Sequence, residues 1–344
     1  MSIVVCTFSC PSRSAISSGE KPISTSRLAW LCRMSCTRIR FTPEAFWQLH
    51  IAVDGNNDGT VKLSSSEKWK EKEPATTLYN KVKEIGAATV TKAERKEKTE
   101  DTPLLYDLTT LQKEANAKHG FTAEQTLEIA QKLYEKKLIT YPRTGSRYIP
   151  EDVFAEIPKL LAFIGALPEW KGKVQAKVQP TRRNVDGSKV TDHHALLVTG
   201  EKPLFLSKED NTVYQMIAGR MIEAFSEKCV KDTTAVTAEC AGVEFIVKGS
   251  VIRQAGWRAV YGEEDKEEIS IPDWQEGDTL TLKGCSITEG KTKPKPLHTE
   301  ATLLSAMETA GKEIEDDALR QALKDCGIGT PATRAAIIEP LFKR

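Results

Sequence analysis

Alternating apolar and polar residues predict β-strands in three parts of this chain. Residues 41–55 end in a strand, and a turn is expected directly after it, at residues 54–55 or 57–59. Residues 87–100 are predicted to form a strand that leads into a charged connection. Between residues 233 and 287, short runs with a period of two are bounded by Gly, Pro and Asp, which is typical of an all-β stretch.

A helical period dominates residues 121–138. Thr122 is the predicted N-cap, and Gln125 follows it three residues later, which forms a capping box. One face of this helix is predicted to be buried, because apolar side chains recur near the helical period at Leu127, Ala130, Tyr134 and Leu138.

The elements follow the order weak start, strands, helices, strands, helices. Residues 64–75 are polar and rich in Lys and Glu, which predicts a loop or an exposed helix, and residues 150–167 and 209–228 have a helical pattern. After a Lys/Pro run at 291–296, residues 297–344 read as helix, glycine-rich turn and helix. We find no internal repeat. A β module interrupted by a helical insertion would explain why the strand-rich stretches are separated.

The helical stretch is followed at once by Thr140, Tyr141, Pro142 and Arg143. Pro142 cannot continue a helix and biases Tyr141 towards an extended conformation, so Tyr141 is expected on a connection just past a helix end. A phenol has a pKa of about 10 and attacks only when a neighbour stabilises or removes its proton. Arg143 points to the same side and could bind a phosphate or steady the phenolate. The plainer interpretation is a half-buried tyrosine beside a surface arginine.

Two adjacent histidines, His193 and His194, lie in the stretch SKVTDHHALLVTG (residues 188–200). Neighbouring side chains face opposite sides of a strand and diverge by about 100° on a helix, so the two are a poor metal pair. Single polar roles fit better, with one histidine directed towards a phosphate and with Ser188 and Lys189 as further donors. A polar loop that enters a strand explains the stretch equally well.

The last candidate site is the stretch CGIGTPATRAAIIEPLFKR, in which Thr330 and Pro331 form a predicted N-cap and N1 pair. Residues 332–334 (Ala, Thr333 and Arg334) then lie in the first turn of a helix, where free N–H groups attract phosphate. Residues 343 and 344 add Lys and Arg at the other end. The alternative is a capped helix after a glycine turn.

Bulk composition sets only wide bounds. The chain has 344 residues, 40% hydrophobic and 28% charged, which fits a protein of two or three domains with real cores. A net charge of +1 says nothing about acidic partners. Residues 171–191, however, carry Lys171, Lys173, Lys177, Arg182, Arg183 and Lys189 against Asp186 alone. This basic stretch is either a solvated loop or a surface that faces phosphates.

Cellular location and cysteine use point to a reducing compartment. No apolar run approaches the roughly 20 residues that cross a bilayer, and residues 2–10 are too short for a signal-peptide core and lack a basic start. We therefore expect a cytoplasmic protein without a membrane partner and without disulfides. The pairs Cys6/Cys10 and Cys32/Cys36 have zinc-like spacing, but the zinc-ribbon framework of aromatic and glycine residues is absent, and no metal ligands are predicted.

Three stretches together resemble the type IA DNA topoisomerases and, within them, the topoisomerase III branch. They are LLYDLTTLQKEANAKHGFTAEQTLEIAQKLYEKKLITYPRTGSRYIP, TDHHALLVTG, and the pair HTEATLLSAMETAG and GIGTPATRAAIIEPLFKR. The resemblance covers roughly residues 41–344. It implies an α+β multidomain fold, in which a β-rich arch holds an inserted helical tyrosine domain and is followed by a helical strand-binding domain.

The resemblance implies five segments. They are an atypical or disordered start that is a remnant of the strand-binding domain (1–40), the first part of the arch (41–112), the helical active-site tyrosine domain (113–228), the second part of the arch (229–296) and a truncated single-strand-binding domain (297–344).

The resemblance also assigns roles to residues. Tyr141 corresponds to the nucleophile that attacks single-stranded DNA and becomes a 5′-phosphotyrosine, after which another strand passes the break and the break is resealed without ATP. Arg143 matches the arginine that positions the tyrosine and the scissile phosphate, and His193 matches a histidine that supports phosphate binding. DNA contacts are expected from Thr140, Arg182, Ser188, Lys189, His194, Thr330, Thr333 and Arg334.

The chain departs from the family pattern near its start. The family begins with a Toprim domain that carries a glutamate and an Asp-x-Asp-x-Glu cluster, which hold Mg²⁺, and that also contributes a lysine near its start. Nothing in this sequence matches it. Pro22 falls near the place of a family arginine, and Gly145 stands where many relatives carry an acidic residue. We therefore expect a fragment that lacks the Mg²⁺ ligands and the far C-terminus, and that would need a Toprim domain or another protein in trans.

Two hypotheses remain. In the first, the chain is a type I DNA topoisomerase by descent, impaired on its own because general acid and electrostatic catalysis are incomplete. In the second, it is a non-catalytic single-stranded-DNA-binding remnant of a truncated reading frame, with salt-sensitive binding. Relaxases and tyrosine recombinases do not fit. The former need a His-x-His metal site, and the latter place the tyrosine after their histidine, whereas Tyr141 precedes His193.

Overall fold

The computed structural model describes residues 41–55, 59–174, 181–190, 192–262, 270–310 and 327–343. The expectations for residues 1–40, with their two cysteine pairs, lie outside this range, as do those for Lys177 and Arg344. In the described part of the chain, no helix is long and apolar enough to cross a membrane.

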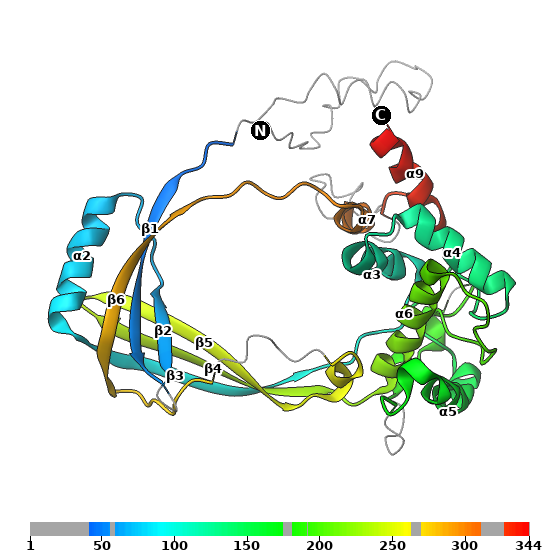
Figure 1. Ribbon diagram of the computed structural model, residues 1–344, viewed down its shortest axis with the longest axis horizontal. Coiled ribbons are helices and arrows are strands. Elements are labelled where there is room, and N and C mark those ends of the chain that lie inside the picture. Colours follow the sequence, from blue (N-terminus) through cyan, green and yellow to red (C-terminus); the bar gives the residue numbers. More distant parts are fainter. Residues whose placement is uncertain are drawn as a thin grey trace.

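Six antiparallel strands close into a barrel in the order β1-β2-β5-β4-β3-β6 (Figure 1). Their bounds are β1 (Ala45–Asp54), β2 (Thr60–Ser65), β3 (Ala87–Glu100), β4 (Cys229–Cys240), β5 (Val243–Gln254) and β6 (Thr279–Lys291). The barrel closes between its first and last strands, where Leu49 pairs with Ile287. β3 and β4 pair along most of their length although more than a third of the chain separates them.

The barrel interior follows from the period of two. Leu49, Ile51 and Val53 of β1 are each at most 1% exposed, because alternate side chains of a strand point into the barrel. Helix α2 (Lys72–Ile85) packs on the side of the barrel away from the opening and buries Ala75 and Val82 (Figure 1). β2 and most of α2 were not predicted. Residues 64–75, which were expected to form a loop or an exposed helix, contain the end of β2, a loop and only the first turn of α2.

In the described part of the chain between β3 and β4, four helices form a second unit, the helical body. They are α3 (Leu108–His119), α4 (Ala123–Glu135), α5 (Glu151–Ala166) and α6 (Lys208–Phe225), with short 3₁₀ turns at η2 (Pro168–Trp170), η3 (Arg182–Asn184) and η4 (Gly187–Lys189). α6 lies at the centre, since Tyr214 and Ile217 are fully buried in the apolar core of the body. The helices predicted at 150–167 and 209–228 are confirmed to within three residues.

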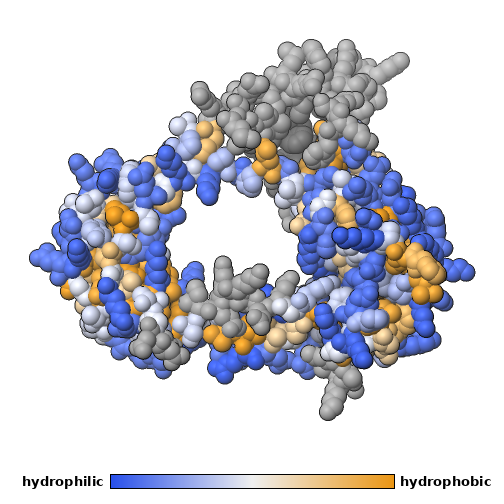
Figure 2. Space-filling view, viewed as in Figure 1, coloured by the Kyte–Doolittle hydropathy of each residue, from blue (hydrophilic) through white to orange (hydrophobic). Residues whose placement is uncertain are grey.

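Among the described residues, two further helices complete a ring. α7 (Glu300–Thr309) and α9 (Pro331–Lys343) pack on α3 and α4 through a small apolar cluster of Ala123, Leu304, Met307, Ala335 and Ile338. We call this contact of α7 and α9 with α3 and α4 the seam. On the opposite side, β3, β4, β5 and η5 (Gly256–Val260) join the barrel to the body. The central opening is visible in both the ribbon and the space-filling view (Figures 1 and 2).

The helix predicted at 121–138 is confirmed at its start and wrong at its end. The capping box of Thr122 and Gln125 is present, but the helix ends at Glu135. The amide of Lys137 donates to Tyr134 O at 2.8 Å and the amide of Leu138 to Leu133 O at 2.9 Å, the pattern of a Schellman motif. The helix therefore stops before Pro142 is reached, and the chain turns back along its last turn.

Candidate active site

The segment that carries Tyr141 is fixed by backbone pairing. Lys137 has a φ of 58°, a left-handed conformation in which the chain reverses after α4. Ile139 then bridges to Val198, and the amide of Thr140 donates to Leu197 O at 2.9 Å. Tyr141 consequently follows a short paired stretch, on a connection past a helix end as the sequence predicted.

Thr140 uses its hydroxyl within the protein. Its Oγ1 donates to Ala195 O at 3.3 Å and accepts from the amide of Leu197 at 3.0 Å. Both bonds hold residues 195–197 beside the Tyr141 segment. The predicted DNA contact of Thr140 therefore stays a prediction, while the structure gives this side chain a positioning task.

The phenol ring of Tyr141 contacts two other aromatic rings. The ring of His193 lies with its centroid 4.4 Å away and is tilted by 47°. The ring of Tyr134, from the last turn of α4, lies 5.4 Å away and is nearly perpendicular at 80°. The structure thus brings Tyr141 and His193 together, as the resemblance implies, and adds Tyr134, which sequence reasoning had assigned to a buried helix face although its side chain is 39% exposed.

Thr144 ties the tyrosine segment to the histidine segment. Its Oγ1 donates to His193 O at 2.8 Å, and its carbonyl accepts from the amide of Leu108 at the start of α3 at 3.1 Å. Thr144 is 2% exposed, so this junction is shielded from water. Arg143, one residue earlier, is exposed, and no hydrogen bond or ion pair forms between it and another described residue.

The two histidines differ in their surroundings. His193 is exposed except for its contact with Tyr141, whereas His194 is half-buried and its Nδ1 lies 2.7 Å from Ala195 O. A carbonyl accepts only, so Nδ1 of His194 carries the proton in this contact. His193 is the histidine with a free face towards solvent.

A buried polar network supports the bridged segment that follows these histidines. The amide of Leu196 donates to Tyr106 O at 2.8 Å, and the Tyr106 hydroxyl donates to Glu114 at 2.7 Å. Arg220 forms ion pairs with Glu114 and, at 3.2 Å, with Glu223. Burial raises the pKa of Tyr106 well above its usual range, so this tyrosine stays neutral and serves as a structural anchor.

Three residues of the basic stretch, Arg182, Arg183 and Lys189, have acidic partners. Arg182 forms an ion pair with Glu151 and stacks over the Phe154 ring, and Lys189 lies 2.8 Å from Asp186. The hydrogen bond and charge of Asp186 raise the pKa of Lys189, and the pKa of Asp186 is lowered by the same contact. Ser188 also donates to Asp186, at 2.6 Å. DNA binding by these side chains would have to compete with pairs that already exist.

The first turn of α9 lies beside residues 141–145, which we call the tyrosine loop. A Cβ at Gly145 would come within 3.5 Å of the Pro331 side chain. Thr330 and Thr333 are exposed and bond to each other, with the Thr330 amide 2.9 Å from Thr333 Oγ1. The predicted start of this helix at Pro331 is confirmed.

Arg334 is 5% exposed and its guanidinium is engaged across the seam. It donates to Ile328 O at 3.1 Å and to Thr109 Oγ1 of α3 at 3.3 Å, and it pairs with Glu308 of α7 at 3.3 Å. The sequence predicted a DNA contact here. The structure shows a buried side chain with partners in α3, in α7 and in the turn before α9, which no local sequence pattern could indicate.

Comparisons with known proteins agree with this geometry. The model of the DNA topoisomerase family matches residues 6–344. The chain belongs to the DNA topoisomerase family. The match begins well before residue 41, so the resemblance is wider than the motifs alone indicate.

Curated relatives named DNA topoisomerase 3 are similar over most of the chain. That of Bacillus subtilis is 34% identical over 337 residues, which is 93% of this chain and 46% of the relative, and that of Bacillus cereus is 36% identical over 86% and 43%. This topoisomerase chain thus spans about half the length of the curated relatives it matches. The resemblance to the topoisomerase III branch of the type IA enzymes is confirmed, and the family is enzymatic.

A solved structure shows the same fold. Full-length topoisomerase I from Thermotoga maritima superposes with a TM-score of 0.66 over 89% of this chain and 48% of the other, at 23% identity. The fold is therefore that of a type IA topoisomerase body with mixed helices and strands.

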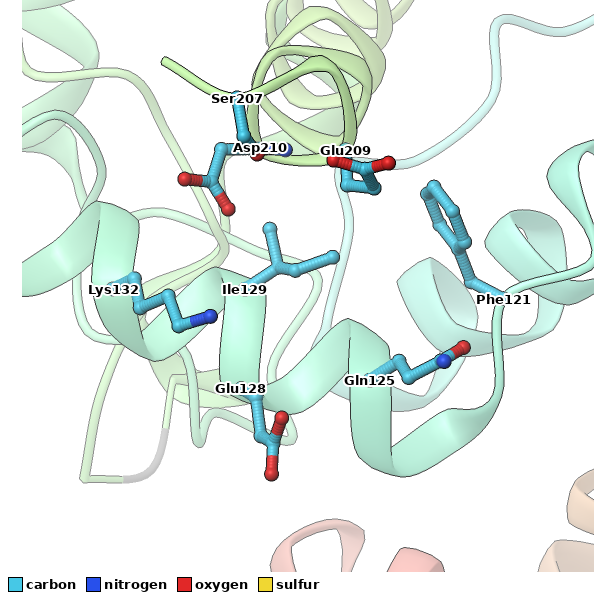
Figure 3. Close-up of a pocket in the computed structure, with 8 residues that line it drawn as sticks. All are labelled: Phe121, Gln125, Glu128, Ile129, Lys132, Ser207, Glu209 and Asp210. Atoms are coloured by element: carbon cyan, nitrogen blue, oxygen red, sulfur yellow. Dashed lines mark hydrogen bonds between the residues drawn. The ribbon is translucent and has the colours of Figure 1, made fainter. Parts of the chain in front are cut away.

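The described residues do not fit a Mg²⁺ site. Nowhere in them do three or more His, Cys, Asp or Glu side chains gather closely enough to hold a metal ion. A surface pocket of about 220 Å³ does carry carboxylates, but it lies between α4 and the start of α6, and no predicted site residue lines it (Figure 3). Its lining is formed by Phe121, Gln125, Glu128, Ile129, Lys132, Ser207, Glu209 and Asp210.

Proposed function

We propose that this chain binds single-stranded DNA and cleaves it transiently through a 5′-phosphotyrosine on Tyr141, lets another strand pass and reseals the break without ATP. The observation that carries the proposal is the contact of the Tyr141 ring with the exposed His193 ring, in a chain of the DNA topoisomerase family. A nucleophile needs neighbours that orient it, and this tyrosine has two.

The reaction exchanges one phosphodiester bond for another. The phenol oxygen of Tyr141 attacks the phosphorus, and the bond between phosphorus and the 3′-oxygen breaks. The phenol loses its proton, and the leaving 3′-oxygen takes one up. The downstream strand is then held by its 5′-phosphate, and reversal of the same exchange reseals the backbone. No further energy source is required, since one phosphate ester replaces another.

Arg143 and His193 are the groups we assign to the phosphate. Arg143 is exposed next to the nucleophile, and a guanidinium offers two parallel donors to phosphate oxygens. His193 touches the ring of Tyr141 and keeps a solvent-facing side. Together they would stabilise negative charge as it develops on the phosphate, which is commonly a large part of such catalysis.

Binding of the single strand is proposed along the first turn of α9 and the basic stretch. Thr330 and Thr333 are exposed near the tyrosine loop, and they lie at the N-terminus of α9, where free N–H groups favour phosphate. Arg182, Ser188, Lys189 and His194 would contribute only when their present partners are exchanged for phosphate. Such binding should weaken as salt is added.

Strand passage requires the ring to open, and the seam is the place where it can. In the described part of the chain, the polypeptide itself crosses every other joint of the ring, whereas α7 and α9 meet α3 and α4 only through side-chain and capping contacts. We propose that α7 and α9 separate from α3 and α4 while the strand is held by Tyr141.

The domains follow the same assignment. We propose an arch of two parts (41–112 and 229–296), a tyrosine domain (113–228) and a strand-binding domain (297–344, with residues 1–40 as a remnant). A Toprim domain or another partner acting in trans would supply the Mg²⁺ ligands that the family uses.

Covalent trapping tests the proposal. The chain is incubated with a 3′-labelled single-stranded oligonucleotide and Mg²⁺, with and without a separately expressed Toprim domain of a relative, and run on a denaturing gel. We expect label that migrates with the protein, more of it when the Toprim domain is present, and none in Tyr141→Phe.

The alternative of a non-catalytic DNA-binding remnant predicts otherwise. The folded chain would then bind the oligonucleotide in a filter or anisotropy assay, Tyr141→Phe would bind equally well, and neither lane would contain an adduct. An adduct that persists in Tyr141→Phe would show that another residue is the nucleophile.

A further inference from the structure

We propose that Tyr134 is a positioning residue which sets the orientation of the Tyr141 ring for attack on the phosphate. The inference rests on the proposed function, because it concerns the same nucleophile. It names a residue that neither the sequence motifs nor the resemblance assigned.

The course of the backbone after α4 places Tyr141 beside Tyr134. Tyr134 lies in the last turn of α4, and the Schellman motif at Lys137 folds the following residues back along that turn. Tyr141 is thereby returned to the side of Tyr134 although seven positions separate them. The two rings meet at 5.4 Å and 80°, within the range that edge-to-face aromatic pairs prefer.

Two rings constrain the nucleophile better than one. A tyrosine side chain turns about χ1 and χ2, and a single neighbouring ring limits these rotations from one direction only. His193 contacts the Tyr141 ring at 4.4 Å with a tilt of 47°, and Tyr134 adds a nearly perpendicular contact. The phenol oxygen is then held at one place before DNA arrives, which is what a reaction limited by orientation needs.

Burial does not explain Tyr134. Its side chain is 39% exposed and belongs to none of the apolar clusters among the described residues, unlike Tyr106 and Tyr214, which are at most 2% exposed. An exposed tyrosine on a helix surface gains little from packing alone. Its one aromatic contact in the described structure is the ring of Tyr141.

Three roles can be separated by substitution. A positioning ring is replaced by phenylalanine without loss, because the ring and not the hydroxyl makes the contact. A proton donor or acceptor would lose its effect in Tyr134→Phe as fully as in Tyr134→Leu. A platform that stacks on a DNA base would change oligonucleotide affinity in Tyr134→Leu.

The first measurement needs no activity. The chain is produced with ¹³C-labelled tyrosine rings, and the signals of Tyr141 are identified by their loss in Tyr141→Phe. Because an aromatic neighbour shifts nearby resonances, Tyr134→Leu should move the Tyr141 ring signals, and Tyr134→Phe should return them close to their original positions. Unchanged Tyr141 signals in Tyr134→Leu would overturn the inference.

The second measurement is the rate of covalent adduct formation in a single turnover. We expect Tyr134→Leu to lower this rate by about 10- to 100-fold, since a displacement of about 1 Å at a reacting atom can cost 100-fold. Tyr134→Phe should restore the rate to within about threefold, and the oligonucleotide Kd should be the same in all three proteins.

The chain offers a matched control. Tyr261 is 40% exposed and makes a similar contact with Trp170, at 5.6 Å and 82°, directly after η5, where the barrel joins the body. Tyr261→Leu removes the same kind of ring and should leave both the Tyr141 signals and the adduct rate unchanged. An equal loss in both leucine variants would show a general effect on folding and would contradict a positioning role.

The outcomes also separate this inference from the proposed function. Absence of an adduct in the wild-type chain contradicts the proposed function, and the ring signals then decide the orientation of Tyr141 by themselves. A normal adduct in wild type together with an equal rate in Tyr134→Leu contradicts only the role of Tyr134.

Discussion

Two joints of the ring, the strand joint and the seam, are built differently. At the strand joint, β3, β4 and η5 connect the barrel to the helical body through continuous chain, paired backbone and ion pairs. Glu100 there binds Arg258 at 2.8 Å and Lys231 at 3.6 Å. At the seam, α7 and α9 rest on α3 and α4 through five small or medium apolar side chains and a few polar contacts.

Two helix ends are capped across the seam. Glu300 of α7 accepts from the amide of Ala123 at the start of α4 at 2.7 Å, and Asn116 of α3 accepts from the amide of Ala301 at 3.2 Å. Lys113 of α3 also pairs with Glu308 of α7. Water can replace each of these contacts when the helices separate, whereas the strand joint cannot separate without breaking a β-ladder. The comparison therefore indicates which joint is built to open.

The largest effect is expected at the strand joint. A Cβ at Gly256 would lie 2.3 Å from Lys228 O, and this residue has a φ of 53°. Gly256→Ala should therefore cost roughly 3 kcal/mol of global stability, from a left-handed conformation and from overpacking against backbone. Urea unfolding followed by circular dichroism measures it. Gly262→Ala, with a φ of 64° and nothing within 4 Å, is the matched control and should cost about 1 kcal/mol.

The next effect is expected at the seam. Arg334→Met removes a buried ion pair with Glu308 and the hydrogen bond to Thr109. We expect a cost of about 2–3 kcal/mol that appears as local opening, because Lys113 still neutralises Glu308 and the rest of the ring is untouched. Amides of α7 and α9 should exchange with solvent faster by about 30-fold or more, and those of β3 and β4 at the original rate. Faster exchange in the strands as well would contradict the comparison.

A smaller effect should follow from uncapping. Glu300→Ala removes the acceptor for the Ala123 amide across the seam and should accelerate exchange in α7 and α9 by an amount equivalent to about 1 kcal/mol. Gln125→Ala is the control, since Gln125 caps the same end of α4 from within the helix. It should loosen the start of α4 and leave α7 and α9 as they were. Equal effects of the two variants on exchange in α7 would show that the cap by Glu300 does not stabilise the seam.

The smallest effect is expected for the Lys113–Glu308 pair, whose side chains are 23% and 30% exposed. Lys113→Met should weaken the seam by about 0.5–1 kcal/mol at low salt, and the difference from wild type should shrink as salt screens the pair. Exchange rates of α7 at low and high salt give the comparison. If the difference in exchange rate between wild type and Lys113→Met did not depend on salt, the effect would come from packing of the aliphatic part of Lys113 and not from its charge.

Much of the local structure could be predicted from the sequence. The capping box at Thr122, the start of α9 at Pro331 and the position of Tyr141 past a helix end all follow from nearby residues. The end of α4 could not, because a Schellman motif with Lys137 in place of glycine carries no obvious signal. Tyr134 was assigned to the buried face because it follows Leu127 and Ala130 at the helical period, whereas α4 buries Thr126, Ile129, Ala130 and Leu133.

The sequence by itself determined which stretches form most of the strands and helices and where several of the helices begin. It also contains the motifs that place this chain among the DNA topoisomerases. These features depend on residues within a few positions of one another, where sterics and capping act directly. Only the tertiary structure decided the closure of β1 on β6, the ring contact of Tyr134 and His193 with Tyr141, and the burial of Arg334 in the seam. Each of these depends on how the chain packs or turns in three dimensions, which no local period records.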